Sequence, residues 1–208
     1  MFVSDADFNQ SCLRQGDVLE AIPFPILDSR AISILGQLDE AKTKASFPVP
    51  QIATLLDNHR SDPNFFWGQV KMRLCHCAVT SHCCEVEARH EKLQVAAFSV
   101  ARIIPVKSSI TADGNKFESL KANKNPIGGD PGYIDYFYFG SHEKLGSESW
   151  MVDYSQIISI PSTEYPSILR RKILQMENRD RVKFKIKLAA YLGRITDEED
   201  SAGLRTPW

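Results

Sequence analysis

The sequence predicts a mainly β protein, a partly open barrel with a few peripheral helices. Short apolar runs rich in Val, Ile, Phe and Tyr recur along the chain and are bounded by Gly, Pro, Asn or Asp. The strongest are LQVAAFSVARIIPV (93–106), YIDYFYF (133–139) and WMVDYSQIISI (150–160). Helical patterns are few and short, so strands should form the core.

Composition limits the classes of protein to which the chain could belong. Its 208 residues, 43% hydrophobic and 25% charged, are ordinary for a globular domain, and its net charge of −1 creates no global field for nucleic acid or membrane. No apolar run approaches the roughly 20 residues that span a bilayer, and the start, MFVSDADFNQ, lacks the layout of a signal peptide. Five cysteines, an odd number, favour a reducing compartment. We therefore expect a cytoplasmic protein with free thiols and no membrane association.

The first part of the chain should supply short strands and one helix. A turn at Gly16 and Asp17 leads into a strand, which Pro23 and Pro25 should end because proline cannot donate to a ladder. The further expected elements are a strand at 31–35, a loop at 39–46, a helix at 52–59 and a central strand from Phe66. In that strand the even positions, from 66 to 74, should face the core.

Beyond the central strand, we expect strands at 93–106, 133–139 and 150–160, with a hairpin loop at 140–149. The polar segment 107–131 is long for a loop and should hide a short helix near 117–122. Residues 182–188 alternate as a strand would, yet LAAYLG (188–193) is a typical helix end with glycine after it. We favour a helix over 179–192 with Asn178 as its N-cap. One domain should then cover residues 1–195, followed by an acidic tail, 196–208.

We expect a chemical centre in the stretch RLCHCAVTSHCCEVE (73–87), since it holds four of the five cysteines. Zinc sites use ligand pairs two to four residues apart with a second pair well downstream, and no second pair follows here. We therefore expect no metal and no other cofactor, and interpret Cys75 and Cys77 as core residues. After Val79 the run becomes polar, and Ser81, His82, Cys84 and Glu85 should form a solvent-reachable cluster.

Within that turn, a catalytic role is one of two interpretations. An imidazole beside a thiol lowers its pKa and creates a nucleophile, and His82 and Cys84 point to the same side of an extended backbone. Packing of Cys84 under the turn is the other interpretation. Asp153 and Tyr154 are similarly open: they could bond within the barrel or contribute to function.

A second candidate site is a basic surface near the C-terminus. Its members could neutralise phosphates, or they could form a solvated helix face. They are Arg170, Arg171, Arg179, Arg181, Lys183, Lys185 and Lys187.

The order of the pieces resembles the MazF/PemK toxin family. The matching parts are Gly16 and Asp17, the apolar strand ending at Ser81, Pro105, and residues 155–157. The turn also resembles that of uncharacterised bacterial proteins with an SHxCE pattern. The resemblance implies an SH3-like barrel closed by a helix. It also implies a binding module that engages RNA or a protein partner, as an accessory of a bacterial defence or toxin–antitoxin system. The enzymatic alternative is a ribonuclease or a cysteine-dependent hydrolase using the turn.

Overall fold

The computed structural model describes residues 1–25, 32–37, 44–48, 67–82, 93, 95–123 and 133–193. The chain divides into two compact units, one made of residues 1–22 and 75–208 and the other of residues 23–74. The single domain that the sequence predicts over residues 1–195 stays a prediction. The predicted acidic tail, 196–208, and the predicted helix at 52–59 lie outside the described residues.

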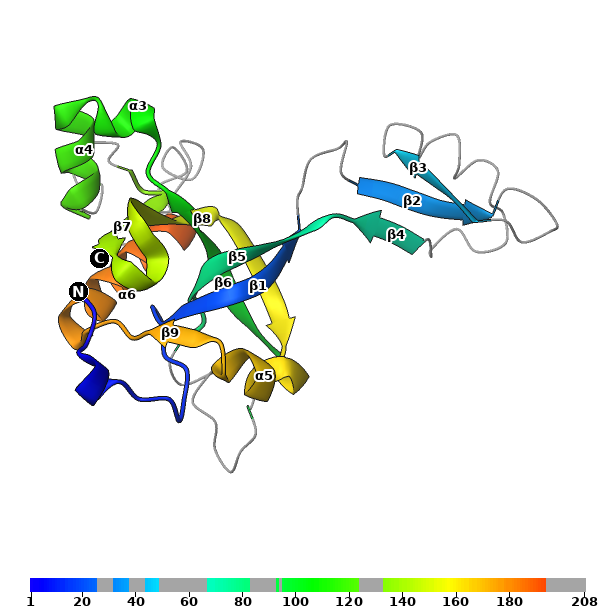
Figure 1. Cartoon of the computed structure of the whole chain (residues 1–208), viewed down its shortest axis with the longest axis horizontal. Coiled ribbons are helices and arrows are strands. Elements are labelled where there is room, and N and C mark those ends of the chain that lie inside the picture. Colours follow the sequence, from blue (N-terminus) through cyan, green and yellow to red (C-terminus); the bar gives the residue numbers. More distant parts are fainter. Residues whose placement is uncertain are drawn as a thin grey trace, which may run out of the picture. The chain divides into compact units, whose positions relative to one another are not determined.

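The first unit is a mainly β fold, as the sequence predicts. Six antiparallel strands curl into a half-barrel in the order β7-β8-β6-β5-β1-β9, with a C-terminal helix against it (Figure 1). The strands of this sheet are β1 (Val18–Pro25), β5 (Met72–Val79), β6 (Ala97–Pro105), β7 (Tyr136–His142), β8 (Gly146–Pro161) and β9 (Lys172–Leu174). The ends of β1 and β5, residues 23–25 and 72–74, belong to the second unit. The helices are η1 (Asp5–Asp7), α3 (Ser108–Thr111), α4 (Gly114–Lys121), η3 (Glu143–Leu145), η4 (Ser162–Glu164), α5 (Tyr165–Leu169) and α6 (Asn178–Leu192).

The second unit contains a three-stranded antiparallel sheet in the order β3-β2-β4. Its strands are β2 (Ile32–Gln37), β3 (Lys44–Pro48) and β4 (Trp67–Val70). The loop predicted over 39–46 is therefore wrong from Lys44 onward, where β3 begins.

Helices cover both faces of the half-barrel near β7 and β8, because successive strand residues point to opposite sides. On one face Phe137 and Tyr154 meet Phe184 of α6 at ring-centroid distances of 5.1 and 5.5 Å. On the other face Met151 packs with Leu120 of α4. The helix predicted near 117–122 and the helix predicted over 179–192 are thus confirmed, although Glu177 rather than Asn178 is the N-cap of α6.

Three strand predictions are corrected. β1 continues through Pro23 to Pro25: β9 pairs with it only at Val18 and Leu19, so the prolines need donate no hydrogen bond on that side. The hairpin loop shrinks to residues 143–145, since β7 and β8 both extend into it. Leu74 is 67% exposed, because within the described chain β5 pairs with β6 only over Cys77–Val79.

Candidate functional site

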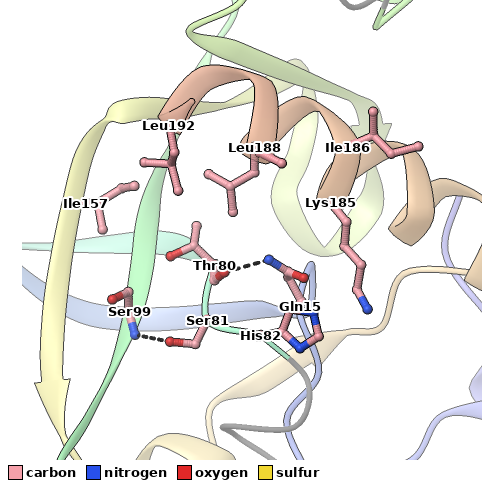
Figure 2. A pocket seen from close by; sticks show the side chains of 11 residues that line it. Gln15, Thr80, Ser81, His82, Ser99, Ile157, Lys185, Ile186, Leu188 and Leu192 are labelled. Atoms are coloured by element: carbon pink, nitrogen blue, oxygen red, sulfur yellow. Dashed lines mark hydrogen bonds between the residues drawn. The ribbon is translucent and has the colours of Figure 1, made fainter. Parts of the chain in front are cut away.

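A hollow of about 620 Å³ lies between α6 and the sheet, and we name it the α6 groove. Figure 2 shows α6 above it, with Leu188 and Leu192 pointing down from the helix and a group of polar side chains gathered beneath. The described residues that line it are Gln15, Thr80, Ser81, His82, Ser99, Ile157, Lys185, Ile186, Leu188, Ala189 and Leu192.

The floor of the groove is built where the turn before β1 meets the end of β5. Gly16 N donates to Val79 O (2.8 Å) and Val79 N donates to Asp17 O (2.9 Å), so the two segments are joined like neighbouring strands. Gly16 has φ +89°, a conformation that favours glycine because it has no side chain. The Gly16-Asp17 turn that the sequence indicates therefore places Gln15 against Thr80.

Two buried oxygens in this floor have no hydrogen-bond partner among the residues that the structure describes. Gln15 is 5% exposed and donates from Nε2 to Thr80 O (2.7 Å), which leaves Gln15 Oε1 unpaired. Thr80 is 6% exposed, and its Oγ1 is also unpaired. Ser81, by contrast, accepts a bond from Ser99 N at 2.7 Å. An unpaired buried polar group costs about 1–3 kcal/mol, so a ligand that reaches these oxygens by displacing the side chains over them would gain affinity.

A buried ion pair fixes the turn that carries Gln15. Lys172 Nζ lies 2.7 Å from Asp17 Oδ2, with both side chains almost fully buried. Lys172 also donates to Asn9 O (2.7 Å) and Cys12 O (3.1 Å), while Arg14 N donates to Asp17 (2.7 Å). Burial raises the pKa of Asp17 to about 6, against the opposing attraction of Lys172. The pair therefore holds residues 9–17 on β9 beneath the groove.

The walls of the groove are mainly aliphatic. Leu188 is buried and belongs to the core, whereas Leu192 is 67% exposed on the same side of α6. Ile157 of β8 lies on the opposite wall (Figure 2). The arrangement, an apolar wall over a few convergent polar groups, is typical of ligand sites.

The charge of the groove is positive. Lys185 lines it, and the described lining includes no Asp or Glu. The α6 sequence, NRDRVKFKIKLAAYL, contains five basic residues and one acidic residue, Asp180. Lys183 pairs with Asp180 at 3.1 Å, whereas no carboxylate of the described residues lies within ion-pair distance of Lys185. An anionic group on a ligand would therefore find its counter-charge at Lys185.

The structure describes two of the four residues of the predicted turn cluster, Ser81 and His82. Ser81 and His82 line the groove, and His82 is exposed, in keeping with a solvent-reachable cluster. Cys84 and Glu85 lie outside the described residues, so their catalytic role stays a prediction. Cys77 is fully buried, as predicted, and burial raises the pKa of its thiol to about 12. Cys75 is only half-buried.

The predicted basic surface loses one member, Lys187. Lys187 is 1% exposed, and burial lowers its pKa to about 8, so its inclusion is corrected. It follows Phe184 by one helical turn and therefore faces inward with it. Arg181 donates to Asn178 Oδ1 (2.8 Å), and Arg171 donates to Ala21 O (3.0 Å). Arg170, Arg179 and Lys183 are exposed, and Lys185 is half-buried in the groove.

Asp153 closes a bulge in β8. Its carboxylate accepts hydrogen bonds from Ser155 N (3.0 Å), Ser155 Oγ (2.6 Å) and Gln156 Nε2 (2.7 Å). Gln156 in turn accepts a bond from Arg102 at 2.9 Å, where the β6–β8 register shifts. Of the two interpretations of Asp153, these bonds support hydrogen bonding within the barrel.

Sequence reasoning missed Gln15, Thr80 and Ile157 as site residues. Gln15 adjoins the turn signal at Gly16, which was the one available indication. The three come from widely separated segments, so only the fold brings them together.

In the described part of the chain, no group of three or more His, Cys, Asp or Glu residues could hold a metal ion. Among the same residues, every helix is too short or too polar to cross a membrane. Comparison with protein-family models, with curated proteins and with solved structures gives no match.

Proposed function

We propose that the chain is a binding module that engages a protein partner through the α6 groove. The observation that carries this proposal is the position of Leu192, an aliphatic side chain 67% exposed beside a hollow. The floor of that hollow holds oxygens of Gln15 and Thr80 that no described residue pairs. An exposed aliphatic wall and convergent polar groups suit a peptide, which offers apolar side chains and main-chain amides together.

A protein partner fits the groove better than RNA. Sites for single-stranded RNA stack bases on aromatic rings and track the backbone with several cations. The described lining contains no Phe, Tyr or Trp and a single lysine, Lys185. Lys187, which the sequence assigns to a basic surface, is buried instead. The wider proposal, an accessory role in a bacterial defence or toxin–antitoxin system, is supported by sequence resemblance alone.

Peptide selection on the full-length chain tests the proposal. A library of random peptides is displayed and selected against the immobilised protein, and the enriched peptides are titrated by fluorescence anisotropy. Leu192→Ser should weaken binding roughly tenfold, since it removes about 1.5 kcal/mol of apolar burial. The matched control is Val182→Ser: Val182 is 52% exposed on the same helix but does not line the groove. It should leave the affinity within about twofold.

Two results would overturn the proposal. One is that the selection enriches no peptide. If the protein then also binds an RNA oligonucleotide in a salt-sensitive way, the nucleic-acid alternative is favoured. The other is equal affinity of the wild type and the Leu192→Ser variant for every enriched peptide.

A further inference from the structure

The α6 groove contains one lysine, Lys185, without a neighbouring carboxylate among the described residues. Lys185 reaches down from α6 toward Gln15 and His82 in Figure 2. Its ammonium group has no ion-pair partner among the described residues, whereas Lys183, two positions earlier, is paired with Asp180. Because the described lining contributes no carboxylate, it would not repel a negatively charged group of a ligand.

The polar floor next to Lys185 shows that the groove is a built site. Gln15 and Thr80 are both more than nine-tenths buried, and each has an oxygen without a partner in the described part of the chain. A carboxamide oxygen accepts from an N–H, and a threonine hydroxyl can donate to a carbonyl. A peptide main chain offers both groups, whereas a purely aliphatic ligand offers neither.

The aliphatic part of the groove lies next to these polar groups. Leu188 is one helical turn from Lys185, and Leu192 is one turn further, so the three side chains follow the same side of α6. A ligand that uses the whole groove therefore needs an aliphatic side chain and a negative charge a few ångströms apart.

We infer that the partner presents an acidic-aliphatic peptide segment, in which an Asp or Glu side chain pairs with Lys185 and a neighbouring aliphatic side chain packs on Leu188 and Leu192. This inference rests on the proposed function and specifies its ligand. Lys185 is then the residue that selects acidic segments, and the leucines supply apolar contact.

A double-mutant cycle tests the pairing. The probes are the tightest-binding enriched peptide and the same peptide with each Asp or Glu replaced in turn by Asn or Gln. Lys185→Gln should weaken binding of the parent peptide about fivefold, the upper range for a partly exposed ion pair. One of the neutralised peptides should bind the wild type about fivefold more weakly than the parent peptide does. The Lys185→Gln variant should bind that peptide and the parent peptide with equal affinity. Lys183→Gln, the matched control, should change the affinity less than twofold.

The outcomes separate the two proposals. If Lys185→Gln leaves every affinity unchanged while Leu192→Ser weakens binding, the acidic specificity is wrong and the binding module stands. If neither variant weakens binding, both proposals fail. Lys185→Arg should keep the preference for acidic peptides; loss of that preference despite the retained charge would also overturn the inference. Unchanged melting temperatures of the variants exclude misfolding as the cause.

Discussion

Replacing Lys172 by Met should destabilise the fold strongly at neutral pH and less at acidic pH. The substitution leaves the Asp17 carboxylate buried and without its counter-ion, 2.7 Å away in the wild type. Removing one partner of a buried pair costs about 3–5 kcal/mol. The same change releases residues 9–17 from β9, because Lys172 also donates to Asn9 O and Cys12 O.

The pH dependence follows from the pKa of Asp17. Burial raises it from 3.8 to about 6 in the folded protein, so protonation of Asp17 stabilises the fold below pH 4, and this contribution is lost as the pH rises through 6. A shift of this size corresponds to about 3 kcal/mol. Lys172 lowers the pKa of Asp17, so in Lys172→Met it should rise further. The cost of the substitution should therefore be largest near neutral pH and should shrink as the pH falls toward the wild-type pKa of Asp17.

Urea unfolding at about pH 7.5 and about pH 5, followed by circular dichroism, measures this difference. Lys183→Met is the control, since Lys183 forms an exposed pair with Asp180 and should cost less than about 1 kcal/mol at both values. A cost of Lys172→Met that is equal at the two pH values, or below about 1 kcal/mol at neutral pH, would refute the reasoning.

Three further predictions concern the surroundings of the groove. Gly16→Ala should lower the free energy of unfolding by roughly 1–3 kcal/mol in urea titrations, because φ is +89° and the added Cβ would lie 3.1 Å from Met176; Gly114→Ala, with no atom within 4 Å, should not destabilise, and equal losses would contradict the account. Lys187→Met should raise the unfolding free energy at pH 7 by roughly 1–3 kcal/mol, since burial lowers the pKa of Lys187 to about 8. The gain should shrink as the pH rises through 8 and wild-type Lys187 loses its charge, whereas a loss of stability at pH 7 would contradict the prediction. In limited alkylation with iodoacetamide, Cys77 should react last because its thiol is buried, and Cys84 should react fastest if His82 lies beside it; mass spectrometry showing equal, slow labelling of all cysteines would rule out the reactive turn.

Local patterns predicted much of the fold. The Gly16-Asp17 turn, the strands that contain residues 97–105 and 150–160, and the C-terminal helix all follow from composition and periodicity over short windows. Strand boundaries were less predictable. Whether β1 runs on through Pro23 to Pro25 depends on its neighbours in the sheet, β5 and β9, and local sequence contains no information about those distant partners.

The site was predictable only in fragments. The sequence assigned Ser81 and His82 to the polar turn and Lys185 to the basic surface. The fold brings all three residues into one groove. Gln15 joins them through backbone bonds between Gly16 and Val79, a long-range pairing that no local pattern reveals. Lys187 shows the opposite case: a lysine is almost always exposed, so composition favours the surface while the helix geometry places it inside.

Methyl NMR of the full-length chain, titrated with the tightest-binding selected peptide, tests the central claim most directly. The account predicts chemical-shift changes at the methyl groups of Ile157, Leu188 and Leu192, which line the α6 groove. The methyls of Leu120 and Leu145, buried outside the groove, should not move. Peptide binding accompanied by shifts at Leu120 or Leu145 alone, with none at the groove, would contradict the assignment of the binding site.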